Sequence, residues 1–117
     1  MLQFIEYPKC STCRKAKAEL NQLGVDFEAV DIVKETPSQE QLLQWMANSE
    51  LEIKSFFNTS GIKYRELGLK EKVPQFSAEE AAALLATDGM LIKRPLLVQD
   101  GRIVQVGYRT EYKELNL

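Results

Sequence analysis

The sequence of 117 residues has no histidine, only two cysteines and no long apolar segment. A zinc site needs about four ligands, most of which are cysteine or histidine in structural sites. Two cysteines without histidine therefore argue against a zinc site built within one chain. The longest wholly apolar run, residues 81–86, is far too short to cross a bilayer. We expect neither a bound metal nor a membrane segment.

No charge of one sign dominates, since the chain has 15 basic and 17 acidic residues and a net charge of −2. This balance gives no reason to expect direct binding to nucleic acid. An apolar content of 44% suffices for one core, and the length predicts a single domain over residues 1–117. The chain enters an apolar strand directly, without the pattern of a signal peptide. We therefore expect a cytoplasmic protein in which a disulfide is transient and functional.

The two cysteines, Cys10 and Cys13, form a C-x-x-C pair between an apolar run at 2–7 and an amphipathic run at 14–23. A strand, this motif and then a helix are typical of a redox site. A helix N-terminus and nearby cations lower the pKa of a thiol. We predict that Cys10 is the attacking thiolate and that Cys13, one turn into the helix, is the resolving thiol. Two buried structural cysteines, or half of a zinc site, are the alternatives.

The start of this helix also suggests how a substrate is held. Ser11 and Thr12 occupy the first helical positions. Backbone N–H groups at a helix start have no partner within the helix and bind anions. We predict that Ser11 and Thr12 contribute to substrate binding.

The middle of the chain predicts a helical insert at about 36–89, after a second strand at 25–32 that would pair in parallel with the first. Thr36 is predicted as an N-cap, with Pro37 as the first helical residue and Gln39 completing a capping box. A short helix is expected around 50–57 and another turn at 64–69. A second capping box at 77–80 opens a last helix, and Trp45 is expected to pack in the core of the insert.

The last third predicts two strands, 96–98 and 103–106, joined by a hairpin turn that contains Asp100-Gly101. Thr110 is expected to cap a final short helix. The complete order is β-α-β, a helical insert and β-β-α. It predicts an α/β fold with a thioredoxin-like (glutaredoxin-like) mixed four-stranded sheet and the C-x-x-C pair at the tip of the first strand.

Arg94-Pro95 precedes the third strand. In a thioredoxin-like fold this proline is expected to be cis and to lie against the C-x-x-C loop. Arg94 would then point toward Cys10, lower its pKa and hold an anion with its guanidinium. A trans proline at a strand start, beside a solvated arginine, is the alternative. The 58–61 loop is expected either to face the active site or to be an ordinary loop.

These segments together resemble the family of glutaredoxin-dependent arsenate reductases (ArsC) and of the Spx and MgsR proteins. The resemblance covers nearly the whole chain and rests on YPKCSTCRKA (7–16), NTSG with YRELG (58–61 and 64–68), IKRPL (92–96) and VGY (106–108). It implies a thioredoxin-like domain with a helical insert, a nucleophilic Cys10 and Arg94 at the active site. By the same resemblance, Asn58 and Pro95 belong to the substrate site.

The sequence departs from the arsenate reductases at three places. Those enzymes use one cysteine and take the second thiol from glutathione, whereas Cys13 here supplies an internal partner. They bind the oxyanion with three arginines, of which Arg94 matches one. Asn58 stands at another, and no arginine stands near Val106. We therefore predict a thiol–disulfide oxidoreductase, with glutathione as a possible co-substrate, in place of arsenate reduction.

The resemblance to Spx implies a second hypothesis: a redox-switched transcriptional regulator that binds the C-terminal domain of the RNA polymerase α subunit. Spx proteins use a glycine of the helical insert for that contact, and residues 49–54 contain none. A third hypothesis is a thioredoxin-like fold without catalysis.

Overall fold

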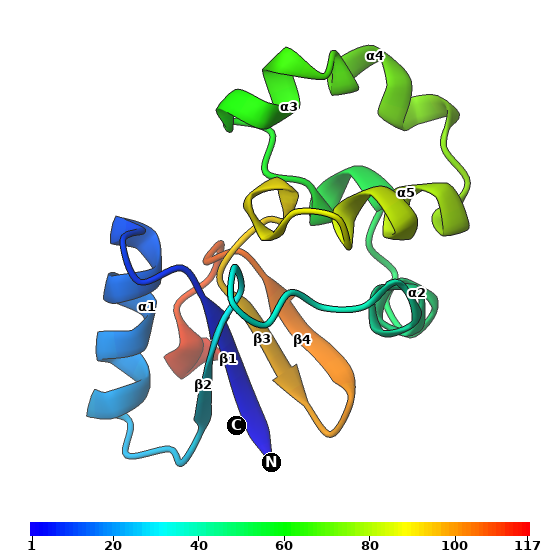
Figure 1. The fold of residues 1–117 in the computed structure, drawn as a ribbon. Helices are drawn as coiled ribbons and strands as arrows, with labels where there is room; N and C mark the ends of the chain where they lie inside the picture. Colours follow the sequence, from blue (N-terminus) through cyan, green and yellow to red (C-terminus); the bar gives the residue numbers. More distant parts are fainter.

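The computed structural model describes residues 1–117 and contains one four-stranded sheet in the order β2-β1-β3-β4 (Figure 1). The strands are β1 Leu2–Glu6, β2 Glu28–Asp31, β3 Leu96–Gln99 and β4 Arg102–Val106. β1 pairs in parallel with β2 and antiparallel with β3, which pairs antiparallel with β4. This mixed sheet confirms the predicted fold class.

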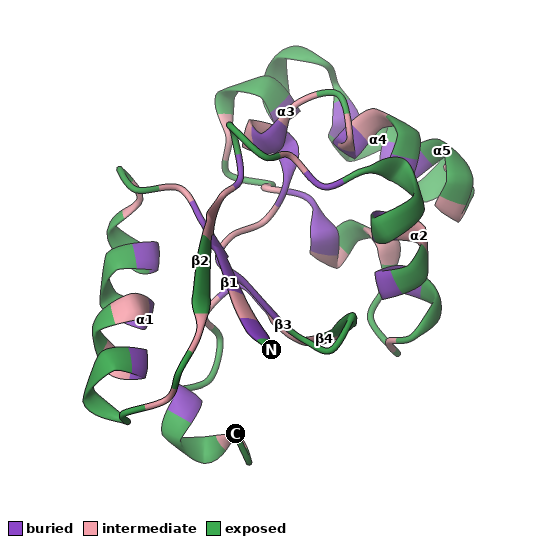
Figure 2. Ribbon diagram, turned by 60° about the horizontal axis from the view of Figure 1, so that its bottom comes forward, coloured by how far each residue is buried: buried purple, intermediate pink, exposed green.

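Helix α1, Ser11–Gln22, connects the two parallel strands, as the sequence predicted. Its buried residues Cys13, Ala16 and Leu20 recur at helical spacing, and they line the side of α1 that faces the sheet (Figure 2). Gly24 follows the helix with φ +68°, a conformation that glycine adopts without a steric cost.

The β3–β4 hairpin turns at Asp100 and Gly101, whose φ angles are +51° and +81°. Positive φ at both central residues matches the twist of the flanking strands, which is why Asp-Gly is favoured there. The hairpin prediction is confirmed.

Side chains alternate between the two faces of the sheet and give the molecule two apolar cores. The smaller core joins the sheet to α1 and to the C-terminal segment through Leu2, Phe4, Cys13, Ala16, Leu20, Leu97 and Tyr112. The larger core joins the opposite face to the insert, with Ile5, Leu96 and Val98 on the sheet side. Trp45 is buried in this larger core, as expected.

The segment between β2 and β3 is helical, which confirms the predicted insert. It contains α2 Gln39–Ala47, α3 Ile62–Glu66, α4 Leu69–Lys72 and α5 Ala78–Leu85, with 3-10 turns at Ile53–Phe56, Val73–Gln75 and Gly89–Leu91. None of the helices combines the length and the apolar character that crossing a bilayer requires.

The predicted start of α2 was wrong by two residues. Ser38, and not Thr36, is the N-cap: its Oγ accepts from the N–H of Gln41 at 3.1 Å, and the Gln41 side chain accepts from the Ser38 N–H. The Thr36 hydroxyl instead donates to the carbonyl of Ile32 at 2.8 Å. Because that bond ties Thr36 to the preceding turn, the capping box moves to the next Ser-x-x-Gln. The second predicted box is confirmed at Ser77 and Glu80.

Two further helices are shorter than predicted. The helix expected around 50–57 is only the 3-10 turn Ile53–Phe56, and the final helix is the 3-10 turn Tyr112–Glu114. Thr110 does not cap that turn. The Glu19 carboxylate of α1 accepts from the N–H groups of Tyr112 and Lys113 at 2.5 and 3.1 Å, so a distant side chain replaces the local cap.

Replacing Ser38 with alanine is expected to lower the free energy of unfolding by about 1 kcal/mol, because the N–H of Gln41 loses its acceptor. Ser60→Ala, in an exposed loop, is the matched control and is expected to stay within about 0.5 kcal/mol of the parent. Urea unfolding followed by circular dichroism measures both. Equal stability of the two variants would contradict the assignment of this cap.

Candidate active site

Cys10 stands at the N-cap of α1, directly beyond the end of β1. Its own N–H donates to the carbonyl of Tyr7 at 2.9 Å, and its carbonyl accepts from the N–H of Arg14 at 3.1 Å. Pro8, which has no N–H, lies in this turn and cannot continue the strand, which ends at Glu6. The turn therefore ends the strand, starts the helix and presents the thiol at the sheet end.

The Cys10 sulfur accepts a hydrogen bond from the N–H of Cys13, with 3.4 Å between Sγ and N. Cys10 is half-buried, and this partial burial opposes ionisation. The donors at Cys13 and Thr12 and the positive charge of Arg94 outweigh burial, so the pKa of Cys10 lies below its usual value. The thiolate is the reactive form of cysteine, so this environment activates Cys10.

Cys13 is fully buried in the smaller core, and burial raises the pKa of its thiol to about 12. The two cysteines of one motif are therefore pushed in opposite directions, which is the pattern expected when two titratable groups take different roles. Both are free thiols in the structure.

The peptide bond between Arg94 and Pro95 is cis, as the sequence analysis expected. The Arg94 Nη1 donates to the carbonyls of Met90 and Ile92 at 3.3 and 3.4 Å. The guanidinium carbon lies 5.3 Å from the centre of the Tyr7 ring, within the range of a cation–π contact. These contacts hold the guanidinium beside the turn that carries Cys10, while the Nε atom is buried without a partner.

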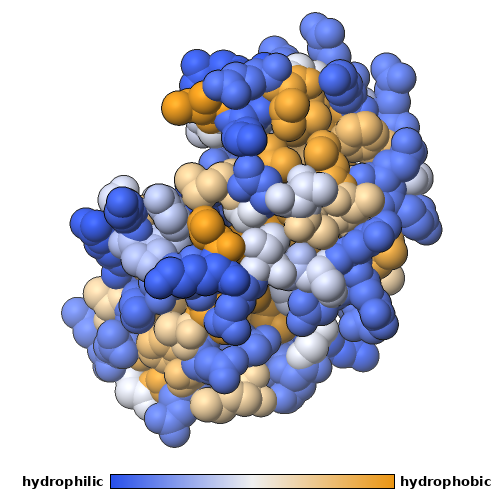
Figure 3. Space-filling model, in the orientation of Figure 1, coloured by the Kyte–Doolittle hydropathy of each residue, from blue (hydrophilic) through white to orange (hydrophobic).

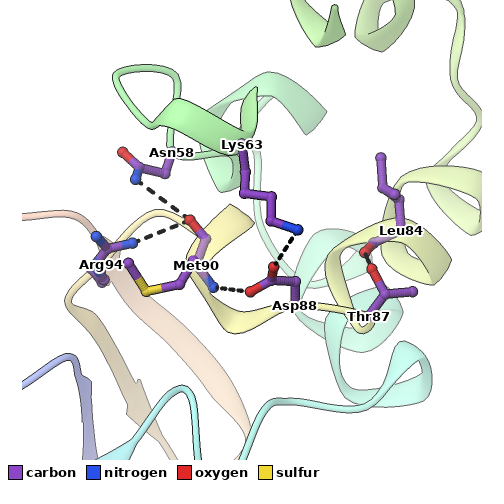
Figure 4. Close-up of polar contacts among 7 residues, drawn as sticks. All are labelled: Asn58, Lys63, Leu84, Thr87, Asp88, Met90 and Arg94. Atoms are coloured by element: carbon purple, nitrogen blue, oxygen red, sulfur yellow. Dashed lines mark hydrogen bonds and ion pairs between the residues drawn. The ribbon is translucent and has the colours of Figure 1, made fainter. Parts of the chain in front are cut away.

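Asn58 lies next to Arg94, because both side chains reach the same carbonyl (Figure 4). The Asn58 Nδ2 is 3.5 Å from the oxygen of Met90, and the Asn58 N–H donates to Leu91 at 2.8 Å. The 58–61 loop therefore faces the arginine, which was one of the two expectations for it.

A cavity of about 490 Å³ lies between this loop and Arg94. Its lining residues are Asn58, Ser60, Gly61, Ile62, Lys63, Asp88, Met90 and Arg94. Two of these residues, Lys63 and Asp88, form an ion pair of 3.4 Å, and Asp88 also accepts from the N–H of Met90 (Figure 4). Figure 3 shows the surface indented between the helical insert and the lobe that carries α1.

The remaining predicted site residues are Ser11, Thr12 and Pro95. Ser11 and Thr12 are the first two residues of α1, with exposed side chains, and the Thr12 N–H helps to lower the pKa of Cys10. Pro95 is buried directly after Arg94. The seven predicted site residues thus belong to three neighbouring segments, although their roles stay predictions.

Sequence reasoning missed the Met90 carbonyl and the Lys63–Asp88 pair. A carbonyl group is present at every residue, so no side-chain pattern marks the one that receives both Arg94 and Asn58. No His, Cys, Asp or Glu cluster that could hold a metal ion is present.

Comparison with known proteins identifies the family. The model of the ArsC family matches residues 5–115. The chain belongs to the ArsC family. It is 50% identical over 115 residues to the uncharacterized protein YusI of Bacillus subtilis, covering 98% of this chain and 97% of YusI. The regulatory protein MgsR of the same organism is 29% identical over 107 residues, covering 92% of this chain and 82% of MgsR.

Among solved structures, a possible arsenate reductase from Streptococcus mutans superposes with a TM-score of 0.97. It is 62% identical in sequence, and the match covers 100% of this chain and 98% of that one. The predicted family and the predicted thioredoxin-like fold are thereby confirmed.

Alkylation of Cys10 is expected to continue at pH values where an unperturbed thiol, with a pKa of about 8.5, is mostly protonated. Arg94→Gln removes a charge that favours the thiolate, so the labelling profile of Cys10 is expected to shift to higher pH. Arg94→Lys keeps the charge and should shift less. Mass spectrometry of protein alkylated at a series of pH values locates the label.

Arg102→Gln is the control for this titration, because Arg102 is exposed at the start of β4. Its profile should match that of the parent. A Cys10 profile that Arg94→Gln leaves unchanged would contradict the electrostatic role of Arg94.

Proposed function

We propose that this ArsC-family protein is a thiol–disulfide oxidoreductase that uses Cys10 as nucleophile and Cys13 as resolving thiol. The observation that carries the proposal is the geometry of the pair: the half-buried Cys10 stands at the N-cap of α1, and its sulfur accepts from the N–H of the buried Cys13 at 3.4 Å. The lowered pKa of Cys10 and the raised pKa of Cys13 agree with it. Cys10 is half-buried, in surroundings that favour its thiolate. Cys13 is a buried, protonated thiol one helical turn further along α1.

In the first step the Cys10 thiolate attacks one sulfur of a substrate disulfide. A bond forms between the Cys10 sulfur and the substrate, the substrate S–S bond breaks, and the other substrate sulfur leaves as a thiolate that takes a proton from solvent. Arg94 favours the thiolate before attack, and the N–H groups at the start of α1 support an anionic group of the substrate.

In the second step Cys13 loses its proton and attacks the Cys10 sulfur. The Cys10–Cys13 disulfide forms and the second substrate thiol is released, so the protein gives up two electrons and the substrate disulfide gains them. Two molecules of a small thiol such as glutathione would return the protein to its dithiol form. A reducing cytoplasm suits this cycle, and no bound cofactor is needed for it.

Arsenate reduction is not part of this proposal. Two cations line the cavity that also contains the neutral Asn58. They are Arg94 and Lys63, and Lys63 is already paired with Asp88. A doubly charged oxyanion would find few of the charge-assisted bonds that it needs there.

Cys10→Ser is expected to reduce disulfide exchange at least about a hundredfold, because the nucleophile is lost. Cys13→Ser should leave the first step in place and accumulate a mixed disulfide at Cys10, visible by intact-protein mass spectrometry after reaction with glutathione disulfide. Exchange by Cys10→Ser at the parent rate, or no adduct on Cys13→Ser, would overturn the proposal.

A second candidate is a redox-switched regulator that binds the C-terminal domain of the RNA polymerase α subunit. The sequence similarity to MgsR and the resemblance to Spx favour it. Cys13 lies in the smaller core with Ala16, Leu20 and Tyr112, so a bond from its sulfur to Cys10 would alter the packing there. A change of redox state would thereby reach the surface through the C-terminal segment.

Pull-down of the purified α C-terminal domain, with the protein either reduced or oxidised, tests this candidate. Binding in one redox state that Cys10→Ser abolishes would support a regulator. An absence of binding in both redox states would exclude the regulator, and the oxidoreductase would remain as the candidate function.

A further inference from the structure

The hydroxyl group of Tyr112, at the start of the 3-10 turn Tyr112–Glu114, is buried without a hydrogen-bond partner. Three buried side-chain atoms of the chain lack a partner, and the other two belong to Arg94 and Gln105, whose side chains bond through another atom. Tyr112 has only this one polar side-chain atom. A buried hydroxyl loses its bonds to water, and most buried polar groups recover them from a partner. The Tyr112 hydroxyl therefore gains nothing for folding, which points to a role other than packing.

The backbone of this turn is anchored to α1 (Figure 1). The Glu19 carboxylate accepts from the N–H groups of Tyr112 and Lys113 at 2.5 and 3.1 Å. The same carboxylate accepts from the Tyr108 hydroxyl at 2.6 Å. The Tyr108 ring packs edge-to-face against the Tyr112 ring, with 4.9 Å between the ring centres. These contacts hold the Tyr112 ring against α1 in one position.

The Tyr112 ring shares the smaller core with Cys13, and both side chains are fully buried there. Burial raises the pKa of Tyr112, and negative charges at Tyr108 and Cys13 raise it further. The hydroxyl therefore stays protonated, and it lies close enough to Cys13 for a charge on that sulfur to act on it. It is a neutral donor without an acceptor, beside a buried thiol.

The resolving step needs a negative charge on Cys13, where the surroundings resist it. The thiolate is the form that attacks, but burial raises the pKa of Cys13 to about 12 and the neighbouring Cys10 opposes ionisation further. A hydrogen bond to a charged acceptor is roughly twice as strong as one between neutral groups. A hydroxyl hydrogen can rotate to suit its acceptor. A donor that is unused in the dithiol and used once the sulfur is charged would speed this step.

We propose that Tyr112 assists the resolving step, in which its hydroxyl donates a hydrogen bond to the Cys13 sulfur as that sulfur becomes a thiolate. Cys13 loses its proton, the leaving substrate thiolate takes one up, and Tyr112 keeps its own. The S–S bond between Cys10 and the substrate breaks as the Cys10–Cys13 bond forms. The inference rests on the proposed function and adds a residue for its second step.

Tyr112→Phe removes the hydroxyl and keeps the ring. The disulfide of 2-mercaptoethanol, which is small and uncharged, oxidises the reduced protein, and mass spectrometry of acid-quenched samples follows the mixed disulfide at Cys10. Tyr112→Phe should form this adduct at the parent rate. It should lose the adduct at least about tenfold more slowly, because the Cys13 thiolate lacks its donor.

Tyr108→Phe is the matched control, because it removes the same atom from the adjacent ring, and that hydroxyl is already bonded to Glu19. It should lose the adduct within about twofold of the parent rate. Equal rates of adduct loss for Tyr112→Phe and Tyr108→Phe would overturn the inference.

Urea unfolding of the reduced proteins separates this role from packing. Tyr112→Phe should be at least as stable as the parent, because it loses only an unpartnered hydroxyl. Tyr108→Phe should be less stable, because the Glu19 carboxylate loses a donor. The variant that slows resolution is thus not the one that loosens the fold. Slow adduct loss by a Tyr112→Phe protein that is less stable than Tyr108→Phe would assign Tyr112 to packing and overturn the inference.

The same kinetics separate this inference from the proposed function. If no adduct forms on the parent or on Cys13→Ser, the oxidoreductase function fails and the role of Tyr112 fails with it. If the adduct forms on both and Tyr112→Phe loses it at the parent rate, only the role of Tyr112 fails and the function stands.

Discussion

An ionised sulfur at Cys10 needs donors, and the N-terminus of α1 supplies them. Its N–H groups have no partners within the helix, and the Cys13 N–H points at the Cys10 sulfur. This arrangement exists because β1 ends just before the turn at Tyr7–Cys10 and α1 starts just after it. The central position of β1 in the sheet and the burial of α1 against it therefore serve to hold one helix end in place.

The helical insert contributes by fixing Arg94. The two carbonyls that receive the guanidinium belong to Met90 and Ile92, and both residues are tied to the insert. The Asn58 N–H bonds to Leu91, and Phe57 pairs with Ile92 in an isolated bridge. The charge that favours the Cys10 thiolate thus depends on packing between distant parts of the chain.

The difference between local patterns and long-range contacts explains what the sequence could and could not predict. The C-x-x-C helix, the Asp100-Gly101 hairpin and the parallel strand pair follow from local patterns, and all three were predicted. The start of α2 failed because Thr36 bonds backward to Ile32, and the last helix is capped by Glu19, about 90 positions away. The Met90 carbonyl that both Arg94 and Asn58 reach is a tertiary contact, and so is the close approach of the Lys93 side chain to Gly107. No spacing in the sequence reveals such contacts.

The opposite pKa shifts also bear on which redox state is favoured. Above the lowered pKa of Cys10, the reduced protein carries a thiolate that its surroundings stabilise, and a disulfide at the same site gains nothing from those donors. Stabilising the reduced form makes the disulfide a stronger oxidant. The raised pKa of Cys13 adds nothing to this below about pH 12, because that thiol stays protonated. For the proposed Cys10–Cys13 disulfide, the oxidising strength would therefore be set at Cys10, by the helix end and by Arg94, and it should fall when either is weakened.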